Sequence, residues 1–156
     1  MDIRIRGLEA APFHALMQLP PEAQAEHLAT MRTADSHPGF PCRVSLDDAQ
    51  PGETVLLANF QHQDAATPFR ASHAIYVRLA ARQAYDAINT VPPALARRTL
   101  SLRAFTAGGW LVGATLTPGT DALDAARTLL ARDEVAYLHA HYAAMGCYAA
   151  WLGRAA

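Results

Sequence analysis

The chain has 156 residues, which is the length of one domain with a substantial core. Hydrophobic residues make up 51% and charged residues 17%, a globular composition that excludes an intrinsically disordered chain. The formal net charge of −1 gives no overall attraction for nucleic acid or for an anionic membrane. No apolar run approaches the roughly 20 residues of a membrane helix, and the N-terminus lacks a secretory signal pattern. We therefore expect a soluble cytoplasmic protein without nucleic-acid or membrane partners.

The basic residues exclude two further classes of protein. All 13 are arginine, because the sequence contains no lysine. Without lysine the chain cannot form a Schiff base with pyridoxal phosphate, nor supply the lysine of a phosphate-binding P-loop. Pyridoxal phosphate and P-loop nucleotides are therefore excluded as cofactors.

The first third of the chain predicts one strand, two helices and an irregular loop. Isoleucine and arginine alternate over residues 3–6, which indicates a strand. Residues 11–17 carry apolar side chains at helical spacing, and residues 22–32 predict a second, weakly amphipathic helix. Residues 35–43 contain two prolines and a glycine, so we expect a rigid loop that ends in Cys42 and Arg43.

The middle of the chain predicts two strands, at residues 53–60 and 69–79, with residues 61–68 as the loop between them. By the alternation of the second strand, His73 lies on its apolar face. Residues 80–89 and 93–98 predict two short helices.

The last third predicts a hairpin of residues 99–105 and 110–116, a helix to about residue 132, and strands at 134–142 and 147–152. Strands clustered in the middle with helices before and after indicate an α+β fold. We expect residues 1–156 to form a single domain, with a mainly antiparallel sheet and helices packed on one face.

Four blocks of sequence carry a family resemblance: PGFPCR at 38–43, PFRASHAIYVR at 68–78, TLSLRAF at 99–105 and HAHYAAMGCY at 139–148. Together they resemble the bacterial domain-of-unknown-function family number twelve hundred and three, whose members are single domains of about this length. The chain departs from the family pattern at His73-Ala74, where the resemblance implies Gly-Pro. The resemblance implies no particular activity. It does imply that five residues occupy positions characteristic of the family: Cys42, Arg43, Arg70, Arg103 and Cys147.

A metal site is the first chemical hypothesis. His139 and His141 lie two residues apart, on one face of a predicted strand, and Cys147 follows a glycine turn. Imidazole and thiolate are good ligands for a divalent metal such as zinc or iron, and three such ligands leave one position open for water. The alternative is that both histidines are ordinary polar residues on a solvated sheet face.

An anion pocket is the second hypothesis. The planar fork of arginine binds carboxylate or phosphate through two hydrogen bonds. Arg43, Arg70 and Arg103 are the candidate substrate-binding residues, provided that the strands and the loop bring them together. The alternative is that each pairs with one of the 14 acidic residues.

A thiol nucleophile is the third hypothesis. Cys42 is the candidate catalytic thiol, and His139 and His141 are the candidate general bases. A cysteine beside turn residues is also often a small buried hydrophobe. The chain contains neither G-x-S-x-G nor G-x-G-x-x-G.

These hypotheses combine into one expected function and one alternative. We expect a small-molecule-binding domain, an enzyme acting on a small acidic or carbonyl compound at a His/Arg/Cys pocket, assisted by a metal. The alternative is a non-catalytic module that binds a ligand or partner without metal, or forms a homodimer through a sheet edge.

Overall fold

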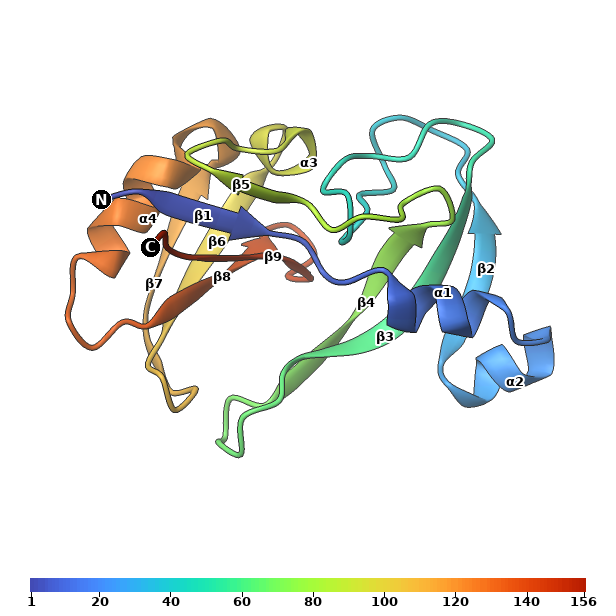
Figure 1. The fold of residues 1–156 in the computed structure, drawn as a ribbon, viewed down its shortest axis with the longest axis horizontal. Helices are drawn as coiled ribbons and strands as arrows, with labels where there is room; N and C mark the ends of the chain where they lie inside the picture. The colour runs from blue at the N-terminus through green and yellow to red at the C-terminus, as the bar shows by residue number, and fades with distance from the viewer.

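The strands form two antiparallel sheets in this computed structural model, which describes all 156 residues (Figure 1). The larger sheet has six strands in the order β5-β1-β9-β8-β6-β7, and the smaller has three in the order β2-β3-β4. The strands of the six-stranded sheet are β1 (Ile3–Arg6), β5 (Asp86–Ile88), β6 (Thr99–Phe105), β7 (Leu111–Pro118), β8 (Tyr137–Tyr142) and β9 (Tyr148–Arg154). Those of the three-stranded sheet are β2 (Ala29–Thr33), β3 (Thr54–Gln63) and β4 (Ala71–Arg78).

The helices are short and lie beside both sheets. They are α1 (Ala11–Met17), α2 (Pro21–Glu26), α3 (Pro93–Ala96) and α4 (Ala122–Leu130), with a 3₁₀ turn at Gly119–Asp121 before α4. The longest, α4, has nine residues, far fewer than the about 20 that a membrane-spanning helix requires. Helix α4 packs against the six-stranded sheet, whereas α1 and α2 lie beside the three-stranded sheet (Figure 1). The predicted α+β class with mostly antiparallel strands is confirmed, but one sheet with all helices on a single face is not what the structure shows.

The six-stranded sheet joins the two ends of the chain. Strand β1 lies between β5 and β9, and Ile3 is directly opposite Arg154, so the termini are neighbours (Figure 1). One face of this sheet packs on α4 through the larger core cluster, to which Leu100, Leu102 and Leu130 belong. The opposite face is turned away from α4, and it carries Arg103, His139 and His141.

Two predicted helices are wrong because strand pairing overrides a weak helical pattern. The helix expected at 22–32 ends at Glu26, since Leu28 adopts a positive φ of 54° and the chain turns into β2, which pairs with β3. The helix expected at 80–89 is instead a loop leading into β5, which pairs with β1. The Arg4 guanidinium binds the Asp86 carboxylate across that pair.

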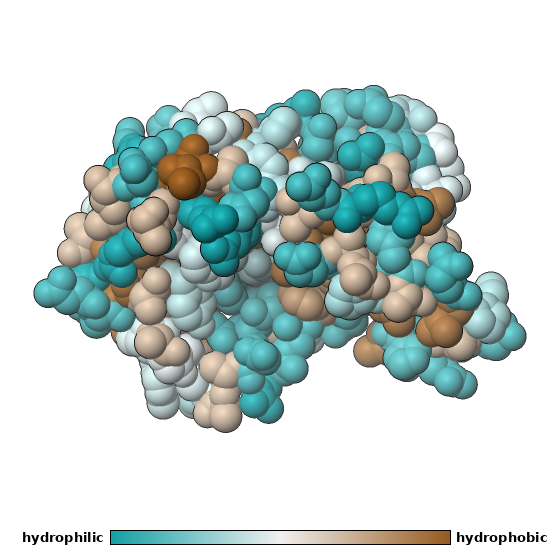
Figure 2. Space-filling model, viewed as in Figure 1, coloured by the Kyte–Doolittle hydropathy of each residue, from teal (hydrophilic) through white to brown (hydrophobic).

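The face of the molecule seen in Figure 1 carries both apolar and hydrophilic residues at its surface. Apolar residues appear there as separate spots among hydrophilic ones, without a continuous apolar patch (Figure 2). Such scattered apolar residues are ordinary for a protein surface. This face therefore gives no indication of a large hydrophobic interface.

Candidate functional site

Three histidines from both sheets come together where the sheets face each other. His62 lies on β3, His73 on β4 and His141 on β8, and their candidate ligand nitrogens all lie within 4.8 Å of one another. We call these three residues the histidine cluster. Three imidazoles whose ligand nitrogens converge in this way could hold a metal ion.

Strand register explains how the residues converge. In an antiparallel pair, directly opposite residues share a face, and Arg103 of β6 lies opposite His139 of β8. His141 lies two residues further along β8, so all three belong to the face turned away from α4. On the smaller sheet His73 lies opposite Phe60, and His62 lies in an irregularity of the β3–β4 register between Gln61 and Gln63, where its ring contacts that of His73.

A hydrogen bond fixes the orientation of the His141 imidazole. Nδ1 of His141 lies 2.8 Å from the carbonyl oxygen of Gly146, which can only accept, so Nδ1 carries the hydrogen. Nε2 of His141 then holds a free lone pair, and this atom is fully buried without a hydrogen-bond partner. A backbone carbonyl that fixes the tautomer in this way is the usual outer partner of a metal-binding histidine.

Burial keeps the cluster imidazoles neutral. Loss of solvent lowers the pKa of His62 to about 4, assisted by the charges of His73 and Arg103. Burial likewise lowers the pKa of His141 to about 3, against the opposing hydrogen bond to Gly146. The pKa of His73 is lowered by the same causes, burial first and then Arg103 and Arg43. Neutral imidazoles have the free lone pairs that a metal ion needs.

The spacing of the cluster suits a metal ion. Nε2 of His62 lies 2.9 Å from Nδ1 of His73. Two nitrogens bound at about 2.1 Å to a tetrahedral zinc ion lie about 3.4 Å apart. In the metal-free protein these two nitrogens share a hydrogen bond, so one of them donates. A zinc or iron(II) ion bound here, with His141 as the third ligand, would replace that bond and move the two nitrogens apart.

An arginine without a partner stands beside the cluster. Arg103 is half-buried and makes neither an ion pair nor a side-chain hydrogen bond, and desolvation lowers its pKa. Arg103 lies directly opposite His139 on the neighbouring strand, and its charge contributes to the lowered pKa of His62, His73, His139 and His141. The positive charge of Arg103 repels a metal cation and attracts an anion. A metal ion in the cluster would therefore bind more favourably when it carries a negatively charged ligand.

His139 lies next to the cluster but outside it. Its ring centroid is 5.7 Å from that of His62 and 6.4 Å from that of His141. Burial, with the charges of His62 and Arg103, lowers the pKa of His139 to about 3. A general base works best with a pKa near the operating pH, so His139 and His141 are weak bases in the metal-free protein.

Neither cysteine belongs to the histidine cluster. Cys42 is fully buried, and its Sγ accepts hydrogen bonds from the backbone N–H groups of Val44, Ser45 and Arg78 at 3.3–3.5 Å. Both cysteines are free thiols. Cys147, predicted as a metal ligand with His139 and His141, is not among the three residues whose ligand atoms converge. The expected catalytic role of Cys42 and metal role of Cys147 remain predictions.

The three candidate arginines lie in three different places. Arg70 is at the end of the β3–β4 hairpin and donates to the carbonyl oxygens of Asp64 and Ala65, so it serves its own loop. Arg103 lies beside the histidines, and Arg43 is buried at the wall of a cavity.

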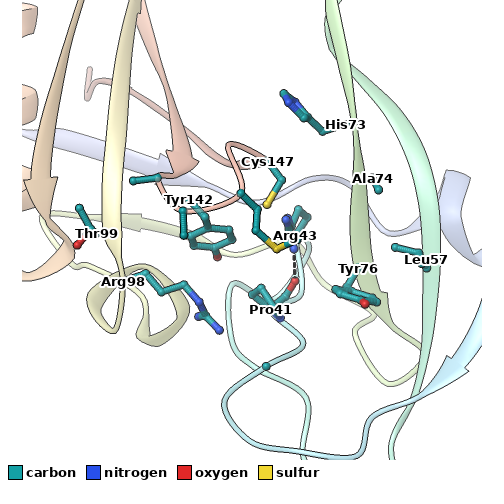
Figure 3. Close-up of a pocket in the computed structure, with 14 residues that line it drawn as sticks. Pro41, Arg43, Leu57, His73, Ala74, Tyr76, Arg98, Thr99, Tyr142 and Cys147 are labelled. Atoms are coloured by element: carbon teal, nitrogen blue, oxygen red, sulfur yellow. Dashed lines mark hydrogen bonds between the residues drawn. The ribbon is translucent and has the colours of Figure 1, made fainter.

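That cavity lies between the two sheets and is about 710 Å³ in volume (Figure 3). We call it the inter-sheet cavity. His73 lines it and also belongs to the cluster, so the two features are adjacent. The remaining lining residues come from the proline-rich loop, from β3 and β4, from the start of β6 and from the β8–β9 turn: Gly39, Pro41, Arg43, Leu57, Ala74, Tyr76, Arg98, Thr99, Tyr142, Ala143, Ala144, Met145 and Cys147.

His62 and His73 belong to the candidate site but carry no motif that marks them in the sequence. The prediction that His73 lies on the apolar face of its strand is confirmed, since it shares that face with Ile75 and Val77 of the smaller core cluster. His62 lies in residues expected to form a loop, but β3 continues to Gln63. The alternation of Leu56, Ala58, Phe60 and His62 was the available signal for this longer strand.

The depressed histidine pKa values predict acid sensitivity of the metal-free protein. A group with a lowered pKa in the folded state stabilises the fold fully above its unfolded pKa near 6.5. That stabilisation is lost as the pH falls from about 6.5 towards the folded values of about 4 and about 3. Urea unfolding in the presence of a chelator is expected to show that the free energy of unfolding falls between pH 7.5 and 4.5. In His139→Gln this fall is expected to be smaller. The exposed His27→Gln is the control and should keep the wild-type profile; a profile that is flat in the wild type contradicts the prediction.

Comparison with known proteins identifies the family. The family model described as protein of unknown function (DUF1203) matches residues 39–154. Neither a search of curated proteins nor a search of solved structures found a match. The matched segment includes all three residues of the histidine cluster and all residues that line the inter-sheet cavity. The chain therefore belongs to the DUF1203 family.

Proposed function

We propose that this protein is a metal-assisted enzyme acting on a small acidic or carbonyl compound, with the metal bound by His62, His73 and His141. The observation that carries the proposal is the convergence of three neutral imidazoles, with ligand nitrogens within 4.8 Å of one another. Zinc and iron(II) are the metals that suit an all-imidazole site.

The chemistry of the site follows from its ligand count. Three protein ligands leave a coordination position for water or for a substrate oxygen, and the metal polarises whatever binds there. The cluster contains no carboxylate, so the charge of the metal is not neutralised by the protein. Arg103 adds a further positive charge close by, and together these charges favour a substrate that is itself an anion.

Aromatic rings around the cluster limit the access of water. The Tyr148 ring stacks on His62 with centroids 5.2 Å apart, and Phe105 lies 5.0 Å from His139. The amide of Gln63 donates to the Tyr137 hydroxyl at 2.8 Å and ties the two sheets together beside the site. Low polarity around the metal strengthens its interaction with a bound anion.

The test measures stabilisation of the zinc-loaded protein by small carboxylates such as acetate. A saturating acid is expected to raise the Tm by about 5 °C in the wild type. Arg103→Gln is expected to weaken acid binding about tenfold, because it removes a charged hydrogen-bond donor. Arg70→Gln is the matched control, since Arg70 binds its own loop, and it should respond as the wild type. An unchanged response in Arg103→Gln, or no response in the wild type, contradicts the proposal.

A second candidate function is a non-catalytic module that pairs through a sheet edge. Strand β7 is the last strand of the six-stranded sheet, and Leu116 on it is 69% exposed. An uncovered edge with an exposed apolar residue can pair with another strand. In this alternative the histidine cluster has no metal, so the metal measurements described in the Discussion distinguish the two functions.

A further inference from the structure

We propose that the inter-sheet cavity binds an organic acid with an apolar body, whose carboxylate is held by Arg43. As a statement about the substrate, this inference rests on the proposed function and names its chemical class. The binding itself needs no metal, because Arg43 is not part of the histidine cluster.

Arg43 offers one nitrogen to the cavity. The residue is 2% exposed, and Nε donates to the Tyr148 carbonyl oxygen at 2.7 Å. Nη1 donates to the Pro41 carbonyl oxygen at 2.6 Å, the bond drawn in Figure 3. Nη2 makes no hydrogen bond within the protein and is not one of the fully enclosed unpartnered atoms. It therefore faces the cavity that Arg43 lines.

The charge of Arg43 has no counter-ion in the protein. None of the ion pairs of the chain includes it. Two carbonyl oxygens and the Tyr142 ring, 5.0 Å from the guanidinium carbon, provide only partial negative charge. A buried charge without an opposite charge is unfavourable, and an anion in the cavity removes that penalty.

The other arginine of the cavity is already neutralised. Arg98 binds both carboxylate oxygens of Asp48, at 2.5 and 3.0 Å. No aspartate or glutamate is among the lining residues, so nothing in the wall repels an anion. The uncompensated charge at the cavity is therefore that of Arg43, and it selects a negatively charged ligand.

The walls of the cavity select an apolar body. Leu57 and Tyr76 form one side, and Ala143 and Met145 lie across from them on the β8–β9 turn. The volume of about 710 Å³ falls within the range of about 300–1,000 Å³ that is usual for small-ligand sites. Acetate fills only a small part of such a space, whereas a six-carbon or aromatic acid contacts both sides.

His73 connects this ligand to the histidine cluster. Its ring stacks on His62 with centroids 5.0 Å apart, and the same residue lines the cavity. An acid in the cavity therefore lies beside one of the proposed metal ligands. This adjacency makes the acid a substrate candidate and not merely a surface ligand.

The experiment is isothermal titration of the metal-free protein, kept in chelator, with hexanoate, acetate and hexanamide. Hexanoate is expected to bind at least about tenfold more tightly than acetate, because its additional methylenes leave water. It is also expected to bind at least about tenfold more tightly than the neutral hexanamide, which lacks the charge that pairs with Arg43.

A pair of variants locates the binding. Ala74 lines the cavity from the edge strand β4, so Ala74→Trp places a large side chain at the cavity and is expected to weaken hexanoate binding at least about tenfold. Ser72→Trp adds the same side chain at an exposed position of the same strand outside the cavity, and it should bind as the wild type. Thermal unfolding verifies that both variants fold.

The outcomes separate this inference from the proposed function. Equal affinity for hexanoate and acetate, equal affinity for hexanamide, or unchanged binding in Ala74→Trp overturns the inference, even where zinc binds to the cluster. Selective hexanoate binding without any zinc binding supports the cavity ligand and removes the metal-assisted function.

Discussion

His141→Ala is expected to weaken zinc binding at least about a hundredfold. Removing an outer partner of a metal ligand already costs about 10- to 100-fold in affinity, and loss of the ligand itself costs no less. His141 is the most enclosed member of the cluster, and its Nε2 is oriented by the hydrogen bond from Nδ1 to Gly146. Competition titration against a chromogenic zinc chelator measures the affinity.

Two controls distinguish loss of a ligand from loss of the fold. His27→Ala removes an exposed histidine far from the cluster in sequence and should retain wild-type affinity. His141→Gln keeps a polar side chain of similar length, and the circular dichroism spectrum of each variant at pH 7.5 shows whether it folds. Wild-type zinc affinity in a folded His141→Ala protein would be incompatible with the proposed site.

Asp48→Ala is expected to destabilise the protein by about 3 kcal/mol or more, as breaking a buried ion pair usually does. The Asp48 side chain is fully buried, and it accepts from Arg98 and Arg97 at 2.5–3.0 Å. Burial opposes ionisation of this carboxyl group, but the two guanidiniums outweigh it and hold its pKa below the ordinary value. Removing Asp48 leaves Arg98 without a carboxylate partner, and leaves Arg97 with only the more exposed Asp47.

An exposed ion pair provides the comparison for Asp48. Asp124 pairs with Arg127 at 2.8 Å, but its side chain is 87% exposed. Asp124→Ala is therefore expected to change the free energy of unfolding by no more than about 0.5 kcal/mol. Urea unfolding at pH 7 measures both variants, and similar losses for the two would show that burial of Asp48 contributes little.

Local patterns in the sequence predicted most of the strands correctly. The alternation of Ile3 and Ile5 with two arginines marked β1, and the glycine turn between residues 105 and 110 marked the β6–β7 hairpin. The stripe of Ala126, Leu129 and Leu130 predicted the buried face of α4. Each of these signals depends only on residues close together in the chain, so it is readable without knowledge of the tertiary structure.

Such local patterns do not predict contacts between residues that are far apart in the chain. Whether nine strands form one sheet or two depends on pairings such as that of β1 with β9, which are some 150 residues apart. The same limit affected the site. The i, i+2 pair His139 and His141 was visible in the sequence, but its true neighbours, His62 and His73, come from another sheet. Cys147, the predicted third ligand, lines the inter-sheet cavity and is not part of the histidine cluster.

The most direct test of the proposed site is X-ray absorption at the zinc edge, on protein purified without a His tag and loaded with one equivalent of zinc. The site predicts three imidazole nitrogens at about 2.0–2.1 Å and no sulfur ligand. A sulfur shell at about 2.3 Å, or a zinc ion surrounded only by water oxygens, would contradict the three-histidine site.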